Sequence, residues 1–240
     1  MSYDYKEGKK RVDEILKNKL EVINNNYLPK SDDLTFNNAY DSWIGSIFVD
    51  IRNSSSLFKN NDNTKISKIM KCFSSELIEI LRNDSKLRDI GIRGDCIYAI
   101  YTVPKKDDFY DLYVKSAYCN TYLKMLNKLL LNHTLPTFKA GIGLGASKTL
   151  VIKAGRKNVG INDKIWIGKS VIDASNFSSI ANTEEFDNIV MSKIFYNNLS
   201  DVDNNVRKYF NLKTSAFGKC YSGHVIMPNY DKWINNNFKD

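Results

Sequence analysis

The sequence predicts an α+β domain in which helices pack on one face of a mostly antiparallel sheet. The chain has 240 residues, 42% of them hydrophobic and 26% charged, which is typical of one large globular domain. Segments of helical periodicity are interspersed with short β-rich runs and hairpin signals, in an order that does not repeat a β–α unit. Only four prolines occur, and neither a linker nor an internal repeat divides the chain.

The chain opens with a predicted helix, followed by a strand and a second helix. Residues 11–24 place apolar side chains at helical spacing and end in a run of asparagines, which predicts an amphipathic helix. Residues 47–51 form a short apolar strand that leads into helix-capping residues at 53–56. Residues 66–81 repeat apolar side chains every three or four positions and predict the second helix.

Hairpin signals flank a long helix in the middle of the chain. Residues 89–101 predict two strands joined by a tight turn at Arg93-Gly94-Asp95. Residues 110–131 have helical periodicity, and residues 138–154 carry several glycines within β-type sequence, which predicts a twisted hairpin.

The last third of the chain predicts a strand, a helix and a final strand. Residues 165–168 form the short strand, and residues 171–180 begin the helix. Residues 221–227 alternate apolar and polar side chains before Pro228.

Charge and cysteine content narrow the classes of function. Thirty-five basic and 27 acidic residues give a net charge of +8, but the lysines are scattered, so we expect a solvated basic surface and neither a nucleic-acid nor a membrane partner. No apolar run reaches the ~18–20 residues of a membrane span, and the opening residues do not resemble a leader, so we expect a cytoplasmic protein. Four cysteines without a paired spacing and two histidines do not support a zinc site. Any metal would be held by oxygen.

Two acidic residues stand inside apolar strand sequence. Asp50 lies in the run Phe-Val-Asp-Ile that ends at Ile51, and Asp95 follows the turn glycine of the predicted hairpin. A carboxylate on a sheet is costly unless a cation or several hydrogen-bond donors compensate it. Two such carboxylates with a backbone carbonyl between them form an oxygen cage that suits Mg²⁺ or Mn²⁺. Alternatively, Asp50 caps the helix that begins near Ser54, and Asp95 is an ordinary turn aspartate.

Residues 53–56 add a candidate anion site, because backbone N–H groups at a helix start point toward the expected metal position; the alternative is a surface cap.

Two phosphate-loop patterns are excluded. Residues 163–170 end in Gly-Lys-Ser, but Asp163 occupies the first glycine position of that motif. The glycines at 141–145 precede β-patterned sequence where a dinucleotide site needs a helix.

These segments resemble the class III nucleotide cyclases. Residues 47–56, Ile-Phe-Val-Asp-Ile-Arg-Asn-Ser-Ser-Ser, resemble their first-strand metal motif, and residues 93–99, Arg-Gly-Asp-Cys-Ile-Tyr-Ala, resemble their second metal hairpin. Residues 152–156 and 162–168, together with Asp-Leu-Thr-Phe at 33–36, resemble the pyrimidine cyclases of the bacterial Pycsar antiphage systems. The resemblance implies a class III cyclase-like fold with a ferredoxin-like core. It also implies an N-terminal helical extension at 1–31, a catalytic domain at 32–228 and a tail at 229–240.

The resemblance implies an enzyme that closes a nucleoside triphosphate into a 3′,5′-cyclic monophosphate with release of pyrophosphate. Two Mn²⁺ or Mg²⁺ ions would be held by Asp50, Asp95 and the carbonyl of Ile51. Members of this family act as head-to-tail homodimers with active sites at the interface, and in the Pycsar systems a separate effector reads the cyclic product.

Departures from the purine cyclases bear on the substrate. The lysine that reads adenine corresponds to Gly91, and the base-reading acid falls on Lys164 or Ile165. Arg93 is a multiple donor suited to a base carbonyl, and Phe48, on the same face as Asp50, is a candidate stacking surface or a plain core residue. We therefore expect UTP or CTP as the substrate, with UTP favoured.

The transition-state residues of the purine cyclases are also missing, since their asparagine and arginine correspond to Ile172 and Asn176. We expect Arg156 or Lys169, or a late lysine such as Lys219, to supply positive charge, with Asn53 and Ser54 as further substrate-binding residues; the alternative is that the three cations are solvated. Two other functions stay open. One is a purine cyclase, and the other is a catalytically silent homologue that only binds nucleotide or a partner.

Overall fold

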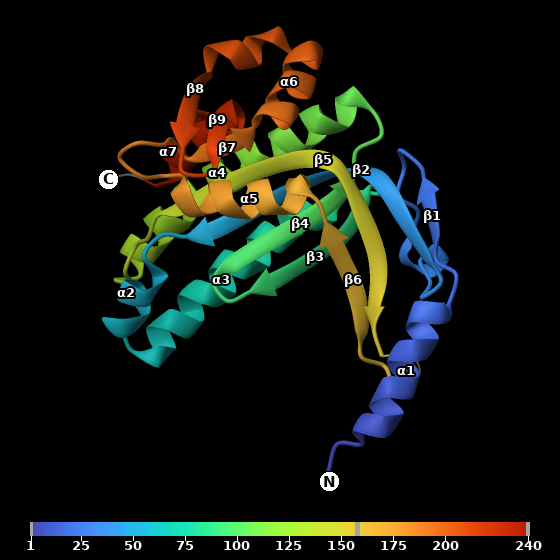
Figure 1. Ribbon diagram of the computed structural model, residues 1–240. Coiled ribbons are helices and arrows are strands. Elements are labelled where there is room, and N and C mark those ends of the chain that lie inside the picture. Colours follow the sequence, from blue (N-terminus) through green and yellow to red (C-terminus); the bar gives the residue numbers. More distant parts are fainter. Residues whose placement is uncertain (1, 157–158, 239–240) are drawn as a thin grey trace.

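The computed structural model describes residues 2–156 and 159–238, which form helices around a single mixed sheet (Figure 1). Its strands in the described chain are β1 (Glu21–Asn24), β2 (Asn38–Ile51), β3 (Leu87–Arg93), β4 (Cys96–Thr102), β5 (Ala140–Gly155), β6 (Asn162–Ile167), β7 (Ile189–Ser192), β8 (Phe210–Ser215) and β9 (Gly218–Gly223). The helices are α1 (Tyr5–Lys17), α2 (Ser54–Lys59), α3 (Asn63–Arg82), α4 (Lys106–Asn132), α5 (Lys169–Ile180), α6 (Lys193–Val202) and α7 (Pro228–Asn237), with 3₁₀ turns at Ser31–Asp33 and Asn204–Lys208.

The sheet is mostly antiparallel, which confirms the predicted fold class. Its strand order is β3-β4-β2-β5-β7-β9-β8, with β1 paired to β2 and β6 paired to β5. The pairs β1–β2 and β5–β7 are parallel, and the others are antiparallel. The predicted helices over 66–81, 110–131 and 171–180 correspond to α3, α4 and α5.

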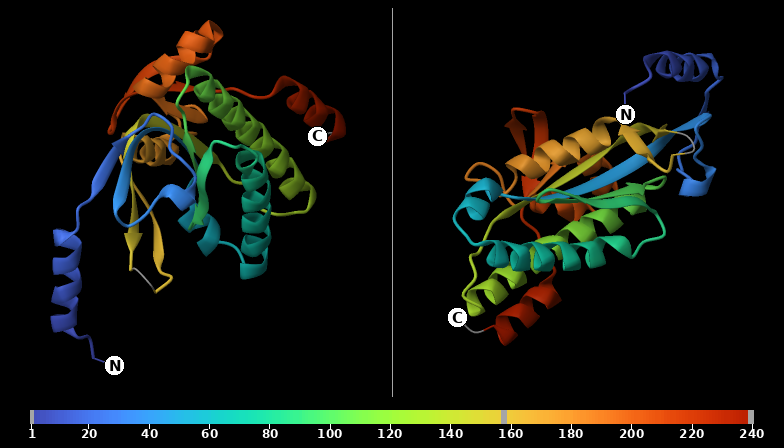
Figure 2. Two further views of the ribbon diagram at one scale, coloured as in Figure 1. Left: turned by 90° about the vertical axis from the view of Figure 1, so that its right-hand side faces the viewer. Right: turned by 90° about the horizontal axis from the view of Figure 1, so that it is seen from below.

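The main core lies between the sheet and helices α3 and α4. Alternate β2 residues, Ile47, Val49 and Ile51, are buried against this layer. The prediction of helices on one face needs a correction, because α5 covers the opposite face while α3 and α4 lie below the strands (Figure 2, right). Ser46, from the alternate β2 face, bonds Ser170 of α5, with 2.7 Å between the two hydroxyl oxygens.

The glycines in residues 138–154 do not form the predicted hairpin. They lie in β5, which is one continuous 16-residue strand, and the turn comes later, between Gly155 and β6. A Cβ at Gly143 would be 1.9 Å from the Ala174 carbonyl oxygen, and one at Gly145 would be 2.0 Å from that of Ser170. The glycines therefore let the backbone of α5 lie directly on the sheet.

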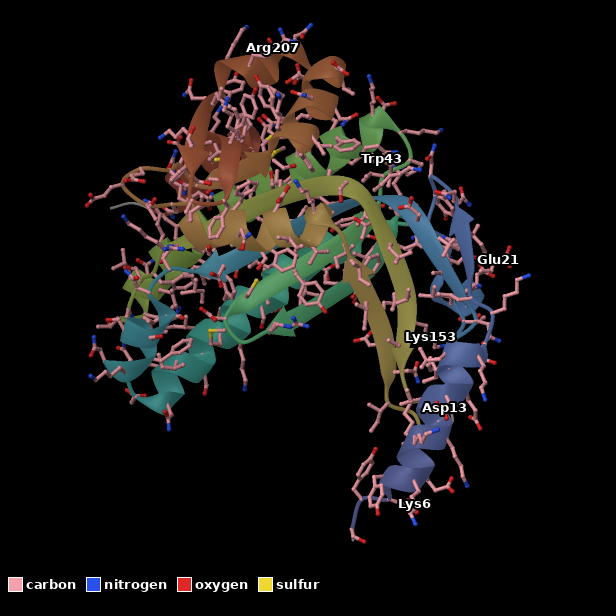
Figure 3. All side chains as sticks on the ribbon, viewed as in Figure 1. Lys6, Asp13, Glu21, Trp43, Lys153 and Arg207 are labelled. Carbon is pink, nitrogen blue, oxygen red and sulfur yellow. The ribbon has the colours of Figure 1, made fainter. Side chains whose placement is uncertain are left out.

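The chain termini also differ from the sequence-based expectation. The first helix ends at Lys17 rather than 24, because residues 21–24 gain hydrogen bonds by pairing in parallel with the start of β2. Helix α1 projects from the body, with Lys6 and Asp13 along its length (Figure 3), and its apolar side chain Leu16 is 77% exposed. The last predicted strand ends earlier, at Gly223, and α7 begins at a proline in the first helical turn. Strands β7 and β8 and helix α6 were not predicted.

No helix in the described residues is long and apolar enough to cross a membrane.

Candidate active site

Asp50 and Asp95 converge at one end of the sheet. Asp50 lies near the end of β2, opposite Cys96 on β4 and Gly141 on β5. Asp95 lies in the β3–β4 turn, where Gly94 adopts a left-handed backbone with φ of 63° that favours glycine. The backbone N–H of Ile51 donates to the Asp95 carbonyl at 3.4 Å, which ties the turn to β2.

The pKa of Asp50 is shifted by burial and by the negative charge of Asp95 nearby. The pKa of Asp50 is raised from 3.8 to about 6. Burial is the largest cause, the negative charge of Asp95 also raises this pKa, and the positive charge of Arg52 lowers it. The Cys96 thiol between the two acids has its pKa raised to about 12, first by burial and then by Asp50 and Asp95. The Arg52 guanidinium donates to the Ser179 carbonyl oxygen of α5. The two carboxylates therefore repel one another at neutral pH.

The donor set at this position fits a divalent cation. Carboxylate and carbonyl oxygens are the ligands that Mg²⁺ and Mn²⁺ prefer. In the described residues, no group of three or more histidine, cysteine or acidic side chains is arranged to hold a metal. The candidate ligands are therefore the Asp50 and Asp95 carboxylates with the Ile51 carbonyl, and a bound cation would relieve their repulsion.

Asn53 and Ser54 follow the acid pair at the start of α2. Asn53 is the N-cap residue, has a left-handed backbone with φ of 52°, and makes no side-chain cap bond. Asp50 thus does not cap this helix. Asn53 is exposed and Ser54 is half-buried, and α2 has only six residues.

A cavity of about 260 Å³ lies beside the acid pair, between β6 and the strands β2, β3 and β4. Phe48 and Arg93, both predicted to contact the base, line it together. The Phe48 and Tyr98 rings stack on its wall, with centroids 5.5 Å apart and planes 23° apart. Its lining residues are Phe48, Asp89, Arg93, Tyr98, Ile100, Asp163, Lys164, Ile165, Trp166 and Val171. Phe48 and Asp50 lie two positions apart on the same face of β2, so the cavity and the acid pair are neighbours.

Sequence reasoning did not assign Asp89, Tyr98 or Trp166 to this cavity. Tyr98 lies opposite Gly91 in the β3–β4 pair, and its ring fills the space above that glycine, where a Cβ would be 2.7 Å from the phenol oxygen. Asp89 accepts a hydrogen bond from the Trp166 indole at 3.0 Å. Strand alternation from Arg93 could have indicated Asp89, whereas the approach of Trp166 depends on how β6 folds over the sheet.

Arg156 and Lys169 do not reach the acid pair of their own chain. Asp50 is opposite Gly141 at the start of β5, while Arg156 follows the last residue of that strand, at the far end of the sheet beyond Lys153 (Figure 3). Lys169 is exposed at the first turn of α5. Its positive charge opposes the rise that burial causes in the pKa of Asp173. Lys219 lies on β9, and Ile172 is 56% exposed.

No protein-family model matches the chain, but curated proteins and solved structures do. A uridylate cyclase from Treponema porcinum is 43% identical over 243 residues, which span all of this chain and 84% of that protein. A uridylate cyclase from Gulbenkiania mobilis is 28% identical over 251 residues, covering 98% of this chain and 97% of that protein.

Solved structures share the fold. The adenylyl cyclase CyaB from P. aeruginosa superposes with a TM-score of 0.65 at 17% identity, over 79% of this chain and 97% of that one. The guanylyl cyclase Cya2 superposes with a TM-score of 0.62 at 14% identity, over 79% of this chain and 95% of that one.

Proposed function

Because this chain belongs to the uridylate cyclase family, whose fold is that of the class III nucleotide cyclases, we propose that it converts UTP into 3′,5′-cyclic UMP and pyrophosphate. CTP is the alternative substrate, since both pyrimidines carry a ring carbonyl. The convergence of Asp50 and Asp95 beside a cavity that contains Phe48 and Arg93 carries the proposal.

The reaction needs positioning and charge neutralisation more than covalent chemistry by the protein. The ribose 3′-oxygen forms a bond to the α-phosphorus as its proton passes to solvent water, and the bond from that phosphorus to the pyrophosphate oxygen breaks. Asp50, Asp95 and the Ile51 carbonyl would hold two divalent cations, Mn²⁺ or Mg²⁺. When bound, these cations lower the pKa of the attacking hydroxyl and neutralise the triphosphate.

The remaining site residues have assigned roles within the same proposal. Phe48 stacks on the base, and Arg93 donates to its carbonyl. Asn53 and Ser54 contact the triphosphate next to the acid pair. Arg156 and Lys169 lie at the other ends of β5 and α5 from Asp50, so they serve the site across a head-to-tail homodimer rather than within one chain.

Chromatography of the products from all four nucleoside triphosphates with Mn²⁺ tests the activity. We expect cyclic product from UTP, with less from CTP and least from ATP and GTP. Asp95→Ala should abolish product and retain the circular dichroism spectrum of the folded chain. A preference for ATP or GTP would favour a purine cyclase, and nucleotide binding without any cyclic product would favour a silent homologue.

Mixed dimers test the division of the site between subunits. Asp50→Asn and Arg156→Ala chains, each weakly active alone, should recover about a quarter of the wild-type activity when mixed, because half of the dimers then contain one intact site out of two. If both residues serve the same chain's site, no site in the mixture is intact and activity is not recovered.

We also propose that the product acts as a second messenger in antiphage defence and is read by a separate effector. The sequence resemblance to the Pycsar cyclases supports this role. Cells that carry the native gene neighbourhood should resist phage, and the Asp95→Ala variant in that neighbourhood should remove the resistance. Unchanged resistance would contradict the role while leaving the cyclase activity to its own assay.

A further inference from the structure

One row of polar groups crosses the cavity floor. Asp89, Gly91 and Arg93 occupy the same face of β3, because alternate residues of a strand point the same way. The hydroxyl of Tyr98 lies over Gly91. Burial raises the pKa of Tyr98, the Asp89 charge adds to this, and Arg93 opposes it, so the hydroxyl senses both neighbours. The row thus runs from a group that only accepts hydrogen bonds, through a hydroxyl, to a group that only donates.

Asp89 is held from across the cavity by β6. The Trp166 indole N–H donates to Oδ2 of Asp89 at 3.0 Å, and the neighbouring Lys164 ammonium donates to the Arg88 carbonyl oxygen. In the described residues, no lysine or arginine forms an ion pair with Asp89, and only Trp166 donates to its carboxylate. The carboxylate therefore has unused acceptor capacity on a cavity wall, and its orientation is fixed by a side chain that arrives from the other half of the chain.

The edge of a uracil ring matches this row. Uracil presents its N3–H donor between two carbonyl acceptors, whereas cytosine presents a lone pair at N3. A carboxylate accepts the uracil proton but repels the cytosine lone pair, and an arginine donates to either ring's carbonyl. A buried polar group that loses its partner discriminates strongly between substrates.

Resting on the proposed pyrimidine cyclase function, we propose that Asp89 is a specificity-determining residue that accepts the N3–H of uracil while Arg93 donates to the adjacent carbonyl. Trp166 is the positioning residue that orients Asp89 toward the base.

The test pairs a base analogue with variants of the wall. In 3-methyl-UTP a methyl group replaces the N3 proton, so wild-type kcat/KM should fall by about 30-fold or more relative to UTP. Asp89→Ala should lower kcat/KM for UTP and reduce this discrimination to about 3-fold or less, because the acceptor is gone. Asp89→Asn, which keeps the shape and an acceptor oxygen for Trp166, should lie between the two and serves if the alanine variant does not fold.

Two further variants distinguish direct contact of Asp89 with the base from the positioning of Asp89 by Trp166. Trp166→Phe removes the indole donor, and we expect a higher KM for UTP with unchanged kcat and a reduced preference for UTP over 3-methyl-UTP. Asp163→Asn changes another cavity carboxylate, whose Oδ1 accepts from the Lys164 backbone N–H, and should keep the preference. Equal use of the two nucleotides by the wild type, or an unchanged preference in Asp89→Ala, would overturn the assignment.

The same comparison works without turnover. If the wild type makes no cyclic product from either pyrimidine triphosphate, the proposed function fails, and calorimetric binding of UTP and 3-methyl-UTP with Mn²⁺ still tests Asp89. Tighter binding of UTP that is lost in Asp89→Ala supports the assignment, and equal binding of both nucleotides to the wild type rejects it.

Discussion

The acid pair and the cavity beside it share one face of the sheet but are assembled over different distances in the chain. Asp50 comes from β2 and Asp95 from the turn that precedes the adjacent strand β4, and the register that places Asp50 opposite Cys96 brings them together. The cavity also needs β6, which pairs with the far half of β5 and reaches β3 through the Trp166–Asp89 bond. The acid pair is therefore fixed by local register, whereas the cavity is fixed by a long-range contact, and substitutions should affect chemistry in the first region and substrate preference in the second.

The largest expected effect lies in the acid pair. Asp50→Asn should lower cyclic-product formation by about 1000-fold, because cation binding contributes several kcal/mol to the transition state. A matched control is Asp41→Asn, which changes an acid on the same strand whose carboxylate lies 3.9 Å from the Lys148 ammonium. A product rate near wild type in Asp50→Asn would contradict this division of the site, because the acid pair would then not be needed for catalysis.

The same variant should stabilise the metal-free protein. The pKa of Asp50 is about 6 when folded and 3.8 ordinarily, so the folded state binds this proton more tightly and loses stability as pH rises from 3.8 through 6. Because Asp50 is half-exposed, the gain in Asp50→Asn at pH 8 is on the order of 1 kcal/mol, and it should vanish near pH 4. Thermal unfolding in chelator at both pH values measures it.

The second-largest effect concerns the helix that both regions share. Gly143 lies opposite Phe48, and its missing side chain lets α5 rest on β5. Gly143→Ala forces a Cβ against the Ala174 carbonyl, so we expect a loss of about 2–3 kcal/mol in the free energy of unfolding. Gly160→Ala has open space but a left-handed φ of 76°, and should cost about 1 kcal/mol. Urea denaturation measures both losses. If Gly143→Ala and Gly160→Ala lose the same free energy of unfolding, the close contact between α5 and β5 is unimportant for stability.

A third effect is a pH dependence of Mn²⁺ binding that belongs to the acid pair and not to the cavity. One proton on Asp50 competes with the cation, so the apparent Mn²⁺ affinity should fall by about tenfold per pH unit below 6 and level off above it. Electron paramagnetic resonance of free Mn²⁺ at pH 5 and 7 measures the change. Arg93→Ala alters the cavity and should keep the same profile, whereas a shifted profile in that variant would show that the two regions are coupled.

The difference between the regions also explains what the sequence could predict. Carboxylates inside apolar strand runs are locally visible, and so Asp50 and Asp95 were found as a candidate pair. The glycines of β5 were interpreted as a hairpin, because a glycine needed for close approach to a helix resembles a glycine at a turn until α5 is placed. Residues 21–24 continue helical periodicity and become a strand only because the edge of β2 is available. Trp166 falls within the stretch 162–168 that resembles the pyrimidine cyclases, but its contact with Asp89 depends on how β6 folds back along β5 and cannot be predicted from local sequence.

The smallest effect tests whether Phe48 belongs to the cavity or to the core. Its ring is half-buried and stacks on Tyr98, so Phe48→Leu keeps the apolar volume but removes the flat surface. We expect KM for UTP to rise about 3- to 5-fold with kcat unchanged, and the melting temperature to change by less than about 3 °C. Val49→Ala on the opposite face, which is fully buried in the main core, should instead lower the melting temperature and leave KM unchanged. A large melting-temperature loss with normal KM in Phe48→Leu would move this residue into the core and leave Arg93 and Asp89 as the groups that contact the base.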